Sequence, residues 1–406
     1  MRVPVEDFPA ASAARPTSVA GRNATILFLS ALTIMAGATI SPALPAIEAH
    51  FAESPNAALL TRLILTVPAL SIAFCAPVAG VFADRYGRRP VALASVLLYA
   101  AAGMSGLYAD SLLILLVGRA LLGVAVAGIM TVATALVGDF FTGPARERFM
   151  GRQSAFIGIG GLFFLTGGGL LAEFHWRAPF AVYAISLALL PAVLLFIPEP
   201  RRASAAERAQ ARQEAGPLFT LPLLAVFGVA ILNSVVFYLM PTQLPFHLQG
   251  VGVDAPVLVG VAMGLMTLCG AVVSFFYGRV RALVSVPGAF ALGFSVMAAG
   301  LLLAGLAGSF AAVLPAAALV GCGLGTIMPT LGSASMALAS DSNRGRVSGM
   351  LTGSIFLGQF ISPFASQPLV AEGGYATAFG VGAASILIAS LIALAVAGGR
   401  RRRMAA

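Results

Sequence analysis

The stretch GVFADRYGRRP, residues 80–90, gathers charge in a chain that is otherwise almost uncharged. It holds one aspartate and three arginines, whereas charged residues make up only 10% of the whole sequence. The runs on either side, 63–82 and 91–107, contain no charged residue. Each run is close to the roughly 20 apolar residues that one helical crossing of a bilayer core requires. The stretch is therefore expected to form a short polar turn between two membrane-spanning helices.

The composition of the whole chain supports the same interpretation. Of the 406 residues, 59% are hydrophobic, and the mean hydropathy is +0.96. Soluble globular chains are about 45–50% apolar and about 25% charged. So little charge cannot cover a soluble protein of this size, so lipid is expected to be the solvent for most of the surface. We predict an all-α membrane protein with twelve transmembrane helices at 24–46, 60–82, 91–109, 112–138, 150–172, 177–197, 218–243, 256–277, 286–307, 311–339, 347–370 and 375–398.

The arginines set the expected orientation. The chain has no lysine, and all but three of its 24 basic residues fall in the tails or in the loops on one side. Arg62 and Arg177 fall on the other side, at the ends of their spans, and Arg119 falls deeper within a span. By the positive-inside rule both termini are cytoplasmic. The net charge of +9 then reflects topology and anionic headgroups rather than nucleic-acid binding.

The chain is predicted to consist of two parallel six-helix halves. The only long polar linker divides the spans six and six, and short motifs repeat in order: SPALP and PTQLP, FADR and FYGR, RERFMG and RGRVSG. Parallel repeats pack about an axis along the membrane normal, with a site between them at mid-membrane. The predicted parts are an N-terminal tail at 1–23, an N-terminal half at 24–197, a linker at 198–217, a C-terminal half at 218–398 and a basic tail at 399–406.

Residues 80–90 resemble the G-x-L-A-D-R-x-G-R-R/K loop motif of the major facilitator superfamily, with only Phe82 departing from it. The glycines allow close helix approach and a tight turn. The resemblance implies that the loop latches the two halves of a transporter during alternating access, in a charge relay that includes Asp139 at the end of the fourth span. The latch residues that the resemblance implies are Gly80, Asp84, Arg85, Gly87, Arg88, Arg89 and Asp139.

Arg119 is a charge inside the membrane, which usually faces the bundle interior and marks a functional path. With Gly123 it resembles the superfamily's R-x-x-x-G motif of the fourth span, which implies a role in proton coupling or substrate orientation. The alternative is that it snorkels from the helix to the membrane interface. No carboxylate lies at mid-membrane in the sequence, so Glu48 at an outer span end is the candidate acid for coupling.

The fifth span resembles, in part, the G-P-x-x-G-G motif of twelve-span drug:proton antiporters, since Gly168 and Gly169 match its final pair. That branch implies a central cavity for an amphipathic organic molecule, lined mainly by the first, fourth, seventh and tenth spans. Polar, aromatic and methionine side chains on the expected lining are Thr33, Thr39, Thr131, Thr134, Asn233, Phe237, Tyr238, Gln243, Met263, Met266, Ser333, Gln359 and Ser362.

We therefore predict a monomeric, multi-pass secondary transporter of a bacterial inner membrane that exports drugs or small amphipathic metabolites. It is expected to use the proton gradient and no cofactor. One alternative is a symporter or facilitator for a sugar or organic acid, in which Arg119 would meet an anion. Another is a non-transporting membrane receptor or assembly protein. An enzyme is not expected, because the sequence shows no metal cluster, nucleotide loop or nucleophile–base pair.

Overall fold

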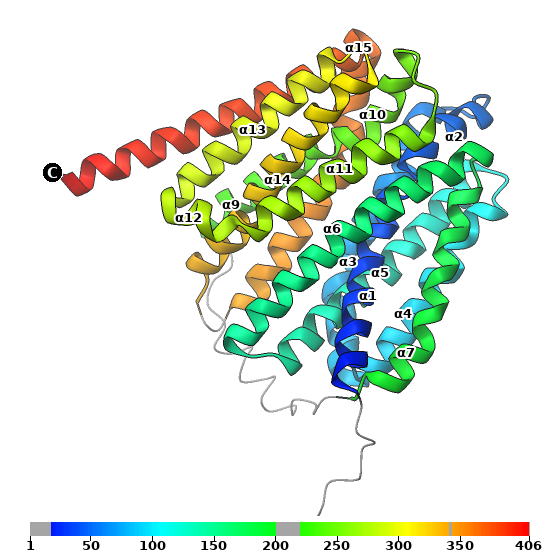
Figure 1. Ribbon diagram of the computed structural model, residues 1–406, viewed down its shortest axis with the longest axis horizontal. Coiled ribbons are helices and arrows are strands. Elements are labelled where there is room, and N and C mark those ends of the chain that lie inside the picture. The colour runs from blue at the N-terminus through cyan, green and yellow to red at the C-terminus, as the bar shows by residue number, and fades with distance from the viewer. Residues whose placement is uncertain (1–17, 200–219, 341–342, 406) are drawn as a thin grey trace, which may run out of the picture.

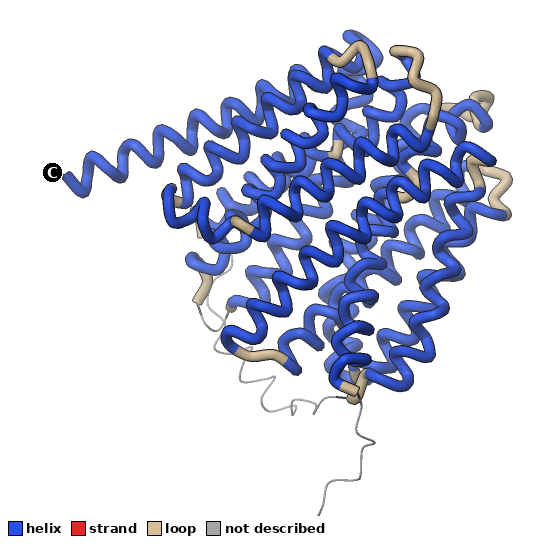
Figure 2. Tube along the Cα trace, viewed as in Figure 1, coloured by secondary structure: helices blue, strands red, loops and turns tan. Residues whose placement is uncertain are grey.

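The computed structural model describes residues 18–199, 220–340 and 343–405, and throughout these residues every regular element is helical (Figures 1 and 2). Eleven of the described helices are long and apolar enough to cross a membrane. The last of them, Arg344–Val396, has 53 residues and a kink at Gly374, where φ is 75°. As one straight helix these residues would span about 80 Å, more than two bilayer cores, but the non-helical backbone at Gly374 divides them into two helices. The predicted all-α architecture is confirmed, and the last two predicted spans lie on either side of Gly374.

The helices follow one another with short connections. The first part of the chain contains α1 (Val19–Ala38), η1 (Ser41–Ala43), α2 (Leu44–His50), α3 (Ala57–Tyr86), α4 (Arg88–Gly103), η2 (Met104–Leu107), α5 (Leu112–Phe140), α6 (Gly143–Phe174), η3 (Ala178–Ala188) and α7 (Leu189–Phe196). The second part contains α9 (Leu221–Phe237), α10 (Leu239–Gly250), α11 (Pro256–Phe275), α12 (Tyr277–Leu283), α13 (Val286–Leu306), α14 (Phe310–Leu338) and α15 (Arg344–Ala405).

The first and seventh spans are interrupted and longer than the predicted ranges 24–46 and 218–243. The first passes from α1 through the 3₁₀ turn η1 into α2, and the seventh passes from α9 into α10 at Tyr238. Pro42 and Pro241 lie at these joints. Proline has no backbone N–H and cannot continue the helical hydrogen-bond ladder. Both interruptions leave backbone carbonyls that side chains of other helices can reach.

The side chains pack around two large buried clusters. One runs from Ile26 to Ile197 in the first part of the chain, and the other lies mostly between Leu223 and Ile386. The two parts meet along α6 against α11, which Figure 1 shows side by side, and along α3 against α15. Glycine makes the first seam close: a Cβ at Gly169 would lie 2.6 Å from the Pro256 carbonyl oxygen.

Parts of the predicted tails and linker cannot be placed. The tail residues 1–17 and the linker residues 200–217 lie outside the described residues. At the other end α15 continues to Ala405 and extends away from the bundle, so most of the predicted basic tail at 399–406 is helical (Figure 1).

Candidate functional site

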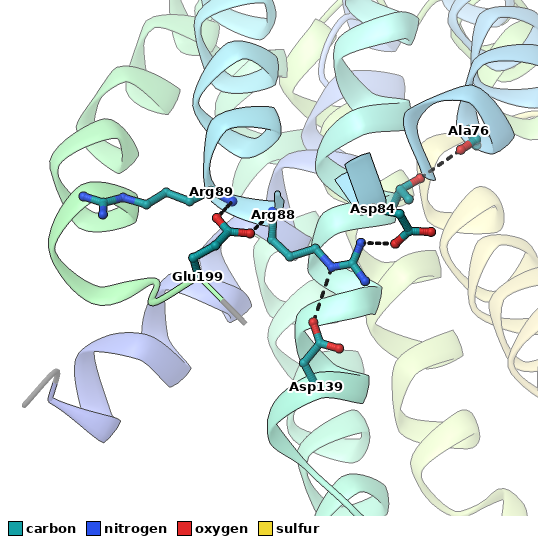
Figure 3. A network of polar contacts seen from close by, with 7 residues as sticks. Ala76, Asp84, Arg88, Arg89, Asp139 and Glu199 are labelled. Carbon is teal, nitrogen blue, oxygen red and sulfur yellow. Dashed lines mark hydrogen bonds and ion pairs between the residues drawn. The ribbon is translucent and has the colours of Figure 1, made fainter. Parts of the chain in front are cut away.

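The loop between α3 and α4 forms a charged network at one end of the bundle (Figure 3). Arg88 lies between two carboxylates: its Nε donates to Asp139 on α5 at 3.4 Å, and a terminal N–H donates to Asp84 one turn earlier. The structure thus brings together the three residues for which the sequence predicts a relay. All three belong to the first part of the chain.

Glu199 completes this network, and the sequence analysis missed it. Its two carboxylate oxygens accept the backbone N–H groups of Arg88, at 2.6 Å, and Arg89, at 3.0 Å. These are the first residues of α4, so Glu199 binds the positive end of the helix dipole. Gly87 makes room for it, because a Cβ there would lie 2.7 Å from the Glu199 Cδ atom. Gly87 also has φ of 106°, which other residues rarely adopt.

The remaining latch residues have less specific surroundings. Arg89 turns away from Asp84 in Figure 3, and its guanidinium donates to the Leu194 carbonyl of α7. Arg85 lies 5.5 Å from the centre of the Tyr86 ring. A Cβ at Gly80 would contact Thr131 of α5 at 3.7 Å, an ordinary distance.

At the opposite end, which the sequence predicts to face outside and which we call the outer end, Arg62 bridges the two parts of the chain. Arg62 lies in α3, within the predicted span 60–82, and only 2% of its side chain is exposed. Its guanidinium donates to Glu48 of α2 at 2.5 Å and to Gln243 of α10 at 3.0 Å. It also covers the ring of Phe246 at 3.8 Å. Glu48 and Gln243, predicted for different roles, are therefore parts of one contact.

A second polar contact closes the outer end beside Arg62. Pro245 has no N–H to give to the carbonyl of Pro241, four residues earlier. The Ser41 hydroxyl of η1 donates to this free carbonyl at 2.5 Å. The two proline motifs that the sequence pairs at an offset of 200 residues are thus in direct contact. Beneath them Leu44, Leu65 and Phe246 form a small apolar cluster.

Arg119 is buried in the interior, so the interpretation that it snorkels to the membrane interface is wrong. None of its surface is exposed, and it donates to the Ile64 carbonyl of α3 at 2.9 Å and to the Tyr183 hydroxyl at 2.8 Å. It also donates to the Ala36 carbonyl of α1. Among the described residues no acid forms an ion pair with it. In the described part of the chain, two backbone carbonyls and the Tyr183 hydroxyl bond to this charge, and the Tyr183 ring centre lies 5.6 Å from the guanidinium.

Two features of α3 and α5 prepare this site for Arg119. Pro68 lacks the N–H that would bond to the Ile64 carbonyl, so that carbonyl is free for the guanidinium. Gly123, one turn beyond Arg119, lets α5 approach the same place: a Cβ there would lie 2.7 Å from the Cα of Pro68. Arg119, Gly123 and Pro68 therefore form one packing unit.

A cavity of about 390 Å³ lies between the two parts of the chain, below the apolar cluster of the outer end. It is lined by residues of α1, α3, α6, α11, α14 and α15, and by residues at the joint between α9 and α10. Polar lining groups are Thr33, Ser154, Tyr238, Thr267, Ser274 and Gln359. The fourth span, α5, was expected to line the cavity, but it lies behind the wall that α1 and α3 form, where it supplies Arg119.

The predicted cavity residues divide into two groups. The cavity is lined by Thr33, Phe237, Tyr238, Met263, Met266 and Gln359. The others lie elsewhere: Gln243 at the outer end, Thr39, Asn233 and Ser362 fully buried, Thr131 against Ala76, and Thr134 and Ser333 on exposed helix surface. The Thr39 and Ser362 hydroxyls donate to the carbonyls of Met35 and Val235.

Sequence signals for the missed residues are weak. Arg62 precedes an uncharged run by one position, which fits both a loop and a helix start. Glu199 follows the sixth span directly, but nothing near it in the sequence points to the α4 terminus, 110 residues earlier. Ser366, which accepts from the Gln243 amide at 2.9 Å, is an ordinary serine in an apolar span.

Comparison with known proteins gives the family. The family model of the Major Facilitator Superfamily matches residues 26–289, well over half of the chain. The chain belongs to the major facilitator superfamily. Its family and fold are those of multi-pass membrane transporters. This major facilitator chain also resembles the crystal structure of a D-xylose–proton symporter, with a TM-score of 0.76 and 14% identity over 92% of this chain and 97% of that one. At this identity the likeness shows the fold alone.

The curated relatives of this major facilitator chain include proteins named for drug resistance. It is 35% identical over 170 residues to the class C tetracycline resistance protein of Escherichia coli, which is 40% of this chain and 41% of that protein. It is 35% identical over 131 residues to multidrug resistance protein 1 of Bacillus subtilis, which is 31% of this chain and 33% of that one. The matches thus span less than half of these relatives.

Proposed function

We propose that this protein is a proton-coupled exporter of small amphipathic compounds in a bacterial inner membrane, working by alternating access. The observation that carries the proposal is the cavity of about 390 Å³ between two separately packed parts, below a closed outer end. Such a cavity with mostly apolar walls and a few hydroxyl and amide groups suits a small organic molecule. The tetracycline and multidrug relatives favour export over uptake.

In this cycle the closed outer end corresponds to a state that loads from the cytoplasm. Two hydrogen bonds join the two parts of the chain at this end, one from Arg62 to Gln243 and one from Ser41 to Pro241. Opening this end requires that both bonds break. We assign the Asp84–Arg88–Asp139 network at the other end to the control of this cycle, as the loop motif implies, and in the present state its ion pairs lie within the first part of the chain. Glu48 is the acid that we assign to the proton response, because it is ion-paired with the buried Arg62.

The test is transport in everted membrane vesicles from an efflux-deficient bacterial strain that expresses the full chain. Growth in a panel of toxic lipophilic compounds first identifies those to which the chain confers resistance. Uptake of these compounds into everted vesicles should then be abolished by a protonophore and by Asp84→Asn, at equal membrane levels. Glu48→Gln should flatten the dependence of uptake on the proton concentration in the vesicle lumen, which corresponds to the outside of the cell.

Other outcomes distinguish the alternatives. Flux that a protonophore leaves unchanged would contradict proton coupling and indicate a facilitator. Accumulation of a compound by intact cells rather than by everted vesicles would contradict export and indicate a symporter. If no compound in the panel gives resistance or flux, the proposal of a broad-range exporter is wrong.

A further inference from the structure

The walls of the central cavity carry neither an acidic nor a basic side chain within the described part of the chain. Their polar groups are the hydroxyls of serine, threonine and Tyr238 and the amide of Gln359. A lipophilic cation that enters such a cavity loses water without gaining a carboxylate. Burying an unpaired charge is costly, whereas a neutral guest avoids this cost. The lining by itself thus disfavours ions of either sign.

Arg119, which lies behind the residues that line the cavity, makes the cavity treat cations and anions differently. Ala36 and Leu65 line the cavity, and Arg119 donates to the carbonyl of Ala36 and to that of Ile64, the residue before Leu65. The guanidinium is therefore a single layer of backbone away from the guest. Its charge is fully buried and has no ion-pair partner among the described acids. In surroundings of low dielectric such a charge acts over several ångströms.

The other charges near the cavity do not cancel this field. Arg62 lies beyond the apolar cluster of Leu44, Leu65 and Phe246, and its charge is balanced by Glu48. The Asp84–Arg88–Asp139 network lies at the opposite end of the bundle, at the ends of α3 and α5. The cavity therefore experiences a net positive field that comes from Arg119.

We infer that the central cavity selects by charge: it accepts neutral and anionic amphipathic compounds and rejects organic cations. The inference rests on the proposed function, because it names the substrate class of the same cavity. It also assigns Arg119 a role as a specificity-determining residue that touches no substrate and acts through its field.

The test compares three aryl probes that differ in charge: the cation and the anion share the same tetraphenyl shape, and the neutral probe is somewhat smaller. They are tetraphenylphosphonium, triphenylphosphine oxide and tetraphenylborate, titrated into the purified full chain in phosphatidylcholine nanodiscs, with empty nanodiscs as blanks. We expect tetraphenylphosphonium to bind about tenfold or more weakly than triphenylphosphine oxide, and tetraphenylborate to bind at least as tightly as the neutral probe. Equal or tighter binding of the cation would overturn the inference, and so would the absence of binding by all three probes.

A variant that keeps Arg119 in place avoids the problem of misfolding. Gln359→Glu changes the shape of a lining side chain very little and supplies a carboxylate to the cavity. It should improve tetraphenylphosphonium binding about tenfold and weaken tetraphenylborate binding. Gln249→Glu, on an exposed turn at the end of α10, adds the same charge outside the cavity and should change neither. Equal effects of the two substitutions would contradict a field inside the cavity.

Binding and transport separate this inference from the proposed function. If the charge preference holds in nanodiscs but no compound is exported from cells, the proposed export is wrong and the selectivity stands. If neutral compounds and cations are exported and bound alike, the proposed export stands and the selectivity is wrong.

Discussion

Arg62 on α3 donates a hydrogen bond of 3.0 Å to Gln243 on α10, which lies 181 residues later, in the other part of the chain. Both side chains are almost fully buried, and the same guanidinium holds Glu48. A hydrogen bond with a charged donor contributes about 1.5–3 kcal/mol. This one exists only while the outer end is closed, so it stabilises the closed arrangement relative to the open one.

Replacing Arg62 by methionine should open the outer end more often. The apolar stem is kept, while the bonds to Glu48 and Gln243 are lost. Leu44, which is fully buried in the outer cluster, provides the reporter when it is changed to cysteine in a chain without Cys75, Cys269 and Cys322. A membrane-impermeant thiol reagent added outside should label it several-fold faster in the Arg62→Met variant.

Arg177→Met is the matched control for this labelling experiment. Arg177 also lies at the outer end and pairs with an acid, but that acid, Asp110, is 85% exposed. Exposed pairs contribute about 0–1 kcal/mol. Labelling of Leu44→Cys should therefore stay unchanged. Equal acceleration by both substitutions would show that charge at this end, rather than the Arg62–Gln243 bond, controls closure.

The bond between Arg119 and the Ile64 carbonyl should couple to Pro68. Arg119→Met leaves the Ile64 carbonyl without a donor, at a cost of about 1–3 kcal/mol. Pro68→Ala restores a backbone N–H to that carbonyl. We therefore expect Pro68→Ala to raise the thermal stability of the Arg119→Met variant more than that of the unchanged chain, measured as the fraction that stays monodisperse after heating. Equal effects in both backgrounds would mean that the proline does not prepare this carbonyl for Arg119.

Gly123→Ala should destabilise the packing of α5 against α3. The added Cβ would lie 2.7 Å from the Cα of Pro68 and from the Cβ of Ser71, and a backbone atom cannot move aside as a side chain can. Overpacking of this kind costs typically 1–3 kcal/mol. Gly138→Ala, in open space on the same helix, is the control and should be neutral or slightly stabilising. The measurement is again the fraction of protein that stays monodisperse after heating. Equal fractions for the two variants would contradict the close approach of α5 to α3.

Arg88→Gln should abolish transport while leaving the fold intact. Arg88 joins Asp84 and Asp139, of which Asp84 is about half exposed. Such pairs contribute about 1 kcal/mol or less to stability. Their loss should appear in the vesicle transport assay and barely in the heating assay. Arg85→Gln removes an arginine from the same loop that makes neither of these ion pairs, and it should retain more transport. A large loss of stability in Arg88→Gln would assign the network to folding instead of transport.

The sequence by itself determined the membrane fold and the chemistry of the α3–α4 loop. Apolar runs of about 20 residues leave no structure but helices, because every backbone polar group in lipid must be bonded within the segment. Asp84 and Arg88 are only four residues apart, so their contact is local to the α3–α4 turn. The proline motifs ending in Pro45 and Pro245 were expected to end the first and seventh spans, whereas in the structure these spans bend near the motifs and continue to His50 and Gly250.

Only the tertiary structure decided which of these groups meet. Three contacts join residues that are far apart in the sequence. Arg62 and Gln243 are 181 residues apart, Glu199 and Arg89 at the start of α4 are 110 apart, and Arg119 and Ile64 are 55 apart. Helical periodicity says which face a residue occupies but not which distant helix covers that face. The same limit explains why the partners of Arg62 were not predicted and why α5 was predicted to line the cavity. Packing of the two parts, set by glycine contacts and by carbonyls that proline leaves free, fixed these positions.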